Sequence, residues 1–114
     1  MKHIRVIAPY RAAYTQPLKV RCGENVTVGL RDDEWEGWIR CTGADGQSSW
    51  VPETYVDVRN GAGKMNRDYD GTELTVHEGE LLTAENEESG WLWCVNASGE
   101  RGWIPAEHAT TISE

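Results

Sequence analysis

Hydrophobic residues along the chain fall in short alternating runs, separated by Gly, Asp, Asn and Ser. No window keeps the 3.6-residue periodicity of an amphipathic helix, so the pattern favours short β-strands. Hairpin loops are expected at residues 43–46 and 97–100, because both segments are rich in turn-forming residues. The runs that predict strands are residues 24–28, 38–42, 49–51, 81–84, 91–95 and 102–104. We therefore expect an all-β fold.

The second half of the chain repeats the first. Trp38 matches Trp91, 53 residues further on, and the match continues without a gap through the next hairpin. The spacing is 56 residues around Leu18 and 59 residues where Tyr10 matches Tyr69. The spacing changes in polar segments, as expected of loops between fixed strands. The chain is thus predicted to be a tandem duplication.

The junction between the two copies is expected at residues 59–63, where two glycines stand in a stretch with no apolar pattern. This gives a first barrel at residues 1–58, a linker at 59–63 and a second barrel at 64–114. With ~55 residues, each half is near the lower limit for a core without disulfides or metal. Five short strands in each half, with a polar loop after the first, predict a small barrel closed to remove its sheet edges.

Composition narrows the classes of function. Nineteen acidic against eleven basic side chains give a net charge of −8, which repels phosphate backbones and anionic lipids, so neither nucleic acid nor membrane is an expected partner. Cys22, Cys41 and Cys94 lack the spacing of a disulfide framework or a zinc site. Cys41 and Cys94 are equivalent in the repeat, which favours core positions. The sequence starts without a long apolar run, and we expect a reduced, cytoplasmic protein.

Four segments occur in the same order in both halves: an opening strand with a Tyr, a Leu-x-Val segment before a Gly-Glu turn, a Gly-Trp strand and a closing aromatic-aliphatic-Pro segment. They are residues 8–11, 18–24, 37–38 and 49–56 in the first copy and residues 67–70, 74–80, 90–91 and 102–109 in the second. With these positions laid out, each half resembles a Src homology-3 (SH3) domain, and the chain resembles the tandem bacterial form.

The resemblance implies an aromatic groove that holds a left-handed Pro-rich peptide. Such a peptide is already ordered and presents flat apolar ridges, so little entropy is lost when it docks. Carried over residue by residue, the first copy offers Tyr10, Trp38, Pro52 and Tyr55, with Tyr14 and Trp35 in bordering loops. The second copy offers Tyr69, Trp91 and Pro105, with His108 in place of the closing Tyr and with Asp70 and Glu73 as acids for a basic ligand.

The leading hypothesis is a non-catalytic module that binds proline-rich or basic extended segments of another protein. No nucleophile–base pair stands out, and His3, His77 and His108 lack the spacing of metal ligands, so we expect no enzyme, metal site or cofactor. Three other interpretations stay open: a structural tandem barrel with no open groove, an aromatic cage for a methylated cation, and cell-wall peptide binding.

Overall fold

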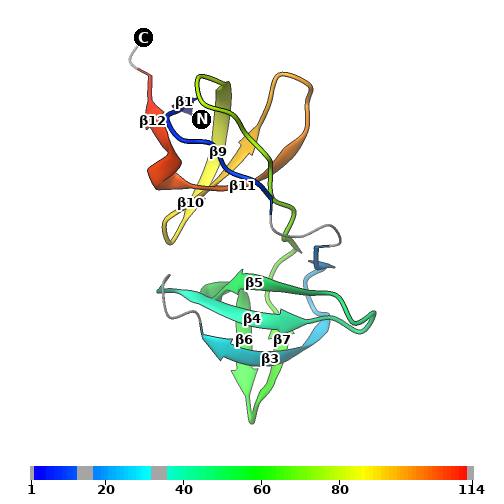
Figure 1. The fold of residues 1–114 in the computed structure, drawn as a ribbon. Coiled ribbons are helices and arrows are strands. Elements are labelled where there is room, and N and C mark those ends of the chain that lie inside the picture. Colours follow the sequence, from blue (N-terminus) through cyan, green and yellow to red (C-terminus); the bar gives the residue numbers. More distant parts are fainter. Residues whose placement is uncertain (1, 13–16, 32–35, 113–114) are drawn as a thin grey trace. The chain divides into compact units, whose positions relative to one another are not determined.

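A computed structural model describes residues 2–12, 17–31 and 36–112, and it confirms an all-β chain with two small barrels (Figure 1). The chain divides into two compact units. Unit 1 comprises Met1–Thr15 together with Thr72–Glu114, and unit 2 comprises Gln16–Gly71. Among the described residues, no helix is long and apolar enough to cross a membrane.

Unit 1 contains a five-stranded antiparallel sheet in the order β11-β10-β9-β1-β12. β1 lies between β9 and β12, with Ile4 opposite Leu82 on one side and Thr111 on the other. The blue N-terminal strand therefore lies among the yellow and red strands of the C-terminal half (Figure 1). The elements are β1 (Lys2–Val6), β9 (Leu81–Glu88), β10 (Trp91–Val95), β11 (Arg101–Pro105), the 3-10 helix η2 (Ala106–His108) and β12 (Ala109–Thr111).

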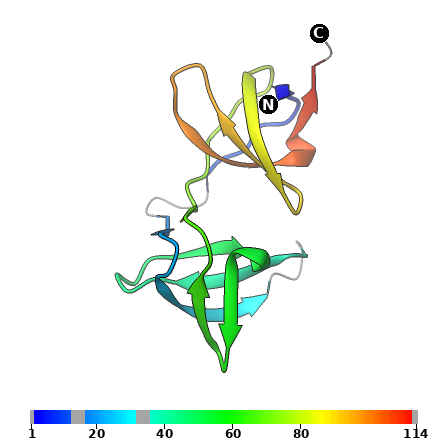
Figure 2. The same cartoon turned by 180° about the vertical axis from the view of Figure 1, so that it is seen from behind.

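Unit 2 contains an equivalent sheet in the order β5-β4-β3-β7-β6. The green strand β7 lies between the cyan strand β3 and the green strand β6, as seen from behind in Figure 2. A separate two-stranded ladder joins β2 (Lys19–Val20) to β8 (Tyr69–Asp70). The other elements are β3 (Asn25–Arg31), β4 (Trp38–Thr42), β5 (Ser48–Pro52), the 3-10 helix η1 (Glu53–Tyr55), β6 (Val56–Arg59) and β7 (Ala62–Met65).

The opening strands are exchanged between the two sequence repeats. A division into barrels at 1–58 and 64–114 would pair β1 with β3 and β7 with β9, whereas the structure pairs β1 with β9 and β7 with β3. Both pairs use the same register, since His3 is opposite Thr83 and the equivalent Ala62 is opposite Thr27. Alternation of hydrophobic residues cannot distinguish the two arrangements, because it is the same in both. The repeats are continuous in sequence, but the compact units are not.

Residues 59–63, expected to be a linker, instead belong to a β-hairpin. β6 ends at Arg59, β7 begins at Ala62, and these two residues are directly opposite each other. Asn60 and Gly61 between them have φ values of 54° and 78°. Positive φ at both central residues defines the type I′ turn, for which Asn-Gly is the preferred sequence. The two glycines of this segment therefore mark a turn and a strand, not a flexible connection.

Each unit encloses its own hydrophobic core. The core of unit 1 consists of Ile4, Val6, Leu74, Val76, Leu82, Ala84, Leu92, Cys94 and Ile104. Unit 2 buries the equivalent residues Leu18, Val20, Val26, Ile39, Cys41, Val51 and Met65. The prediction that Cys41 and Cys94 are core residues is confirmed, since both side chains are 0% exposed. Burial raises the pKa of Cys41 to about 11 and that of Cys94 to about 12, where the charge of Glu85 adds to the effect.

Candidate functional site

The predicted groove residues gather in two clusters, but the exchange of opening strands changes their membership. Tyr10 lies in unit 1 with Trp91, Pro105 and His108, which we call the unit 1 cluster. Tyr69 lies in unit 2 with Trp38, Pro52 and Tyr55, which we call the unit 2 cluster. The expectation that each groove draws on one sequence repeat is therefore wrong. Each cluster takes its opening Tyr from one repeat and its Trp, Pro and closing ring from the other.

In the unit 1 cluster, Tyr10 is the central ring. Its centroid lies 5.6 Å from that of Trp91 and 5.6 Å from that of His108, with both pairs edge to face. Pro105 lies opposite Trp91 across the β10–β11 ladder. The Tyr10 hydroxyl donates a 2.8 Å hydrogen bond to Oε1 of Glu73, which holds a carboxylate beside the ring.

Backbone contacts fix the position of this cluster. Tyr10 follows β1 and forms an isolated antiparallel bridge with Val76. His108 ends helix η2, and its carbonyl accepts a 2.7 Å hydrogen bond from the amide of Ile7. Nδ1–H of its ring donates to the carbonyl of Pro9 at 3.1 Å. Tyr10, Trp91 and His108 are all half-buried, so their rings keep exposed surface while their orientation is set.

In the unit 2 cluster the rings are more deeply buried. The centroids of Tyr55 and Tyr69 are 5.7 Å apart, again edge to face. The Tyr69 hydroxyl donates a 2.8 Å hydrogen bond to the carbonyl of Trp50, so it is occupied within the unit. The exposed fractions are 4% for Trp38, 6% for Tyr55 and 6% for Tyr69. The matched positions of the two units thus differ in how much aromatic surface they offer.

Arg67 is a contributor to the unit 2 cluster that the sequence analysis missed. Its guanidinium carbon lies 4.4 Å from the centroid of the Tyr55 ring, within the range of a cation–π contact. In the repeat, Arg67 stands where the other opening segment has Ala8. This replacement of a small residue by a long cation was a readable signal in the sequence. It places one of the protein's own cations over an aromatic face in unit 2.

The remaining candidates are distributed differently from expectation. Asp70 lies in unit 2, where it pairs with Lys19 in the β2–β8 ladder, whereas Glu73 lies in unit 1. Tyr14 and Trp35 lie outside the described residues. Trp93 packs edge to face on Trp103 at 5.3 Å, so these two rings form a separate pair on neighbouring strands of unit 1.

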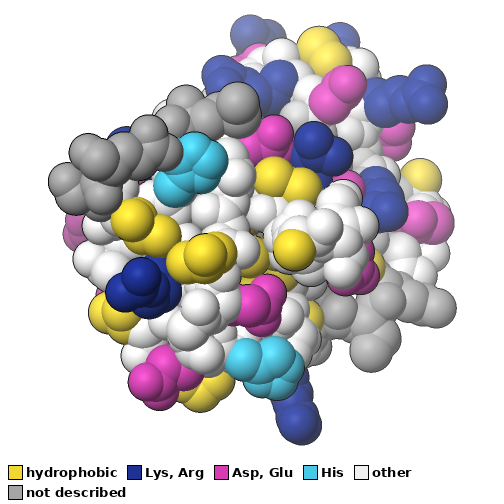
Figure 3. All heavy atoms as spheres, turned by 90° about the horizontal axis from the view of Figure 1, so that it is seen from above, with side chains coloured by type: hydrophobic (Ala, Val, Ile, Leu, Met, Phe, Trp, Pro, Cys, Tyr) yellow, Lys and Arg dark blue, Asp and Glu magenta, His cyan; other side chains and the backbone are white. Residues whose placement is uncertain are grey.

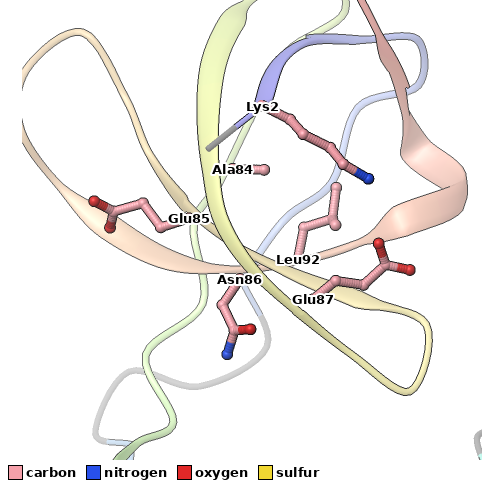
Figure 4. Close-up of a pocket in the computed structure, with 6 residues that line it drawn as sticks. All are labelled: Lys2, Ala84, Glu85, Asn86, Glu87 and Leu92. Atoms are coloured by element: carbon pink, nitrogen blue, oxygen red, sulfur yellow. The ribbon is translucent and has the colours of Figure 1, made fainter.

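The acidic segment at the end of β9 is partly neutralised within the protein. Glu85 Oε1 accepts a hydrogen bond from Nε of Arg101 at 2.9 Å. A surface hollow of about 130 Å³ lies along this strand. Among the residues that line it, Lys2, Leu92 and Glu87 point to one side and Glu85 to the other (Figure 4). A cation therefore shares this hollow with the carboxylates. Hydrophobic, acidic and basic side chains are also interspersed on the face shown in Figure 3.

Unit 1 therefore holds two half-buried rings around a central Tyr, with a Pro across the ladder and a carboxylate at the edge. The variant SH3 domain family matches the chain twice, at residues 3–59 and 62–109. This protein belongs to the variant SH3 domain family. The two family matches follow the sequence repeats, so each SH3 repeat contributes its opening strand to the compact unit formed mainly by the other.

Known relatives are also SH3-containing proteins. The chain is similar to an SH3 and F-BAR domain-containing protein of Dictyostelium discoideum, with 23% identity over 96% of the chain and 23% of that protein. It is similar to the human and mouse SH3 and PX domain-containing protein 2A, with 39% identity over 59% of the chain and 6% of those proteins. The chain thus spans less than a quarter of the length of these relatives. They are eukaryotic, so the bacterial form stays a prediction. No solved structure matches the chain.

Proposed function

We propose that this protein is a non-catalytic interaction module that binds a proline-rich, basic peptide segment of a partner protein through the unit 1 cluster. The observation that carries the proposal is the half-buried set of Tyr10, Trp91 and His108 around one ring, beside the carboxylate of Glu73. Membership of the SH3 family supports a role in protein interaction.

The chemistry of the cluster suits such a ligand. The half-buried rings keep some exposed surface, and aromatic surface suits the flat ridges of a polyproline-type helix. The ligand is already extended, so little conformational entropy is lost on binding. The carboxylate of Glu73 attracts a ligand Arg or Lys, and the net charge of −8 favours encounter with basic segments.

Unit 2 has a supporting role in this proposal. Its rings are nearly buried, and Arg67 covers the Tyr55 face with a positive charge that repels a basic ligand. Burial of three aromatic side chains contributes to the stability of the unit instead of offering a surface. The structural interpretation, left open by the sequence, is therefore favoured for unit 2.

The test is a titration followed through the indole N–H signals of ¹⁵N-labelled protein. The probe is a synthetic peptide with two Pro-x-x-Pro turns and a flanking Arg. We expect saturable shifts of the Trp91 signal, with a Kd on the order of micromolar to tens of micromolar, and no shift of the Trp38 signal. Trp91→Ala should weaken binding at least tenfold. The matched control is Trp93→Ala, in the same strand but paired with Trp103, which should bind like the wild type.

Two comparison peptides separate the alternatives. The same peptide with Ala in place of Pro should bind at least tenfold more weakly, because it lacks the preformed helix. A trimethyl-lysine peptide without Pro should leave Trp91 unshifted. Equal binding of that peptide would support an aromatic cage instead, and a lack of shifts with every peptide would contradict the proposed function.

A further inference from the structure

The two opening strands occupy equivalent places and differ at both inward positions, Ile4 against Gly63 and Val6 against Met65. The difference in side-chain volume is largest at the first of these positions. Ile4 in β1 is opposite Leu82, and Gly63 in β7 is opposite Val26, the equivalent of Leu82 in the repeat. Ile4 is 2% exposed and belongs to the core of unit 1. The same site therefore holds a four-carbon side chain in one unit and no side chain in the other.

Unit 2 fills the space above Gly63 from neighbouring strands. A Cβ atom added to Gly63 would lie 2.7 Å from Cγ2 of Val28, 2.7 Å from Cγ1 of Val56 and 3.1 Å from Cγ2 of Val26. Real Cβ atoms essentially never approach other heavy atoms to 2.7 Å. Even Ala would therefore require the valines of β3 and β6 to move.

Unit 1 shows the reverse arrangement. The equivalents of Val28 and Val56 are Ala84 and Ala109, and both pack in or against the core that contains Ile4. One large residue with two alanines and one glycine with two valines contain the same number of side-chain carbon atoms. Because interiors are close-packed, each set fills its own site.

The unexchanged pairing would violate this balance in both units. Ile4 would meet Val28 and Val56 where a single Cβ has no room, and Gly63 would leave a void beside Ala84 and Ala109. Overpacking and cavities are both destabilising. A second position adds to the effect: a Cβ on Gly71 would lie 2.6 Å from Oγ of buried Ser49, and the other opening segment has Ala12 at this place.

We infer that side-chain volume at these matched positions selects the exchanged pairing, so that β1 is specific for unit 1 and β7 for unit 2. The repeat leaves backbone register and alternation identical in the two arrangements. The two arrangements differ in how well the side-chain volumes fit: Ile4 fits beside two alanines in unit 1, and Gly63 fits beside two valines in unit 2. This inference does not depend on the proposed function.

Cysteine pairs in the full-length chain report which pairing forms. His3→Cys with Thr83→Cys places thiols on directly opposed residues of the exchanged pairing. His3→Cys with Thr27→Cys does the same for the unexchanged pairing, because Thr27 is the equivalent of Thr83. Both are made in a Cys22→Ser background, since Cys22 is the exposed native thiol. After mild oxidation of dilute protein, peptide mass mapping should find the 3–83 disulfide at least ten times more often than the 3–27 disulfide.

The decisive variant swaps the volumes with Ile4→Gly and Gly63→Ile, which keeps the overall composition. This chain should reverse the preference and form the 3–27 disulfide. A folded double variant that keeps the 3–83 disulfide would overturn the inference.

If the double variant does not fold, Gly63→Ala alone gives a separate test. It should lower the Tm by about 5–10 °C, and adding Val56→Ala should recover most of that loss. Gly63 lies in a strand without positive φ, so the change tests packing and not backbone strain. A neutral effect of Gly63→Ala would equally overturn the inference.

Discussion

Units 1 and 2 are built from the same repeat, yet they present their shared aromatic positions differently. In unit 1, Tyr10 and Trp91 are half-buried and Tyr10 is tied to a carboxylate. In unit 2, Tyr69 and Trp38 are almost fully buried, and the Tyr69 hydroxyl is tied to a backbone carbonyl. The same types of residue at matched positions of two repeats can therefore differ in exposed surface, and binding depends on that surface.

Removing residues 1–12 should have the largest effect on stability, and it should affect unit 1 but not unit 2. The truncation takes away β1, with Ile4 and Val6 from the core, and each such buried aliphatic contributes about 2–5 kcal/mol. Unit 1 should unfold, so the signals of Trp91, Trp93 and Trp103 should collapse to unfolded positions, while Trp38 and Trp50 stay dispersed in a ¹H–¹⁵N spectrum.

Arg5→Ala, at an exposed position of the same strand, is the control for this truncation and should leave both units folded. Loss of the Trp38 and Trp50 signals instead would mean that β1 belongs with the first repeat, contrary to the exchanged pairing.

Alkaline pH should lower the stability of both units through their buried thiols. The pH range over which stability falls should be wider in unit 1, because the pKa of Cys94 is higher than that of Cys41. In the unfolded chain the thiols ionise from about pH 8.5 upwards, whereas the folded pKa values are about 11 for Cys41 and about 12 for Cys94. The folded state then keeps protons that the unfolded state has lost. Below pH 8 the two thiols do not change the free energy of unfolding with pH. Above the unfolded pKa and up to the folded pKa, that free energy falls by up to about 1.4 kcal/mol per pH unit for each thiol.

Urea unfolding between pH 8 and 10.5 measures this slope. Cys41→Ala and Cys94→Ala should each make it shallower, and the double variant more so, while Cys22→Ala is the exposed-thiol control. Equal slopes in the wild type and all four variants would show that the buried thiols do not ionise on unfolding in this range.

Arg67→Ala should have the smallest effect on stability. It tests whether the guanidinium that lies over the Tyr55 ring stabilises unit 2. Loss of the cation–π contact with Tyr55 should lower stability by about 0.5–1 kcal/mol. Peptide affinity at the unit 1 cluster should be unchanged. The control is Arg59→Ala, at an exposed position of β6 in the same unit, which removes one positive charge but no contact with Tyr55. If both variants lose equal stability, the position of Arg67 over the ring has no energetic role.

Much of the fold could be predicted from local patterns. Residues 38–42 and 91–95 were predicted as strands with their observed bounds, because their turns and alternation are clear. The strand predicted at 81–84 continues to Glu88, since Asn86 and Glu87 pair with β10 although they carry no apolar signal. Tertiary pairing, not local propensity, extends this strand.

The candidate site was less predictable than the strands. The closing position of His108 was recognised, but its contact with Tyr10 rather than Tyr69 follows from the exchange. The two repeats share the same hydrophobic alternation, so local rules fit either pairing equally well. The differences in side-chain volume around Ile4 and Gly63, and the long side chain of Arg67, do differ between the repeats. Their meaning depends on neighbours far along the chain.

The exchanged strands also set an order for folding during translation. Every strand of unit 2 lies between β1 and β9 in the sequence, so unit 2 can fold on the ribosome while β1 still lacks its partner. At about 5–20 residues per second, β1 stays exposed for several seconds before β9 and β12 are made. Lys2, His3 and Arg5 alternate with Ile4 and Val6 at exposed positions, and polar or charged side chains on an unpaired strand disfavour its pairing with other chains.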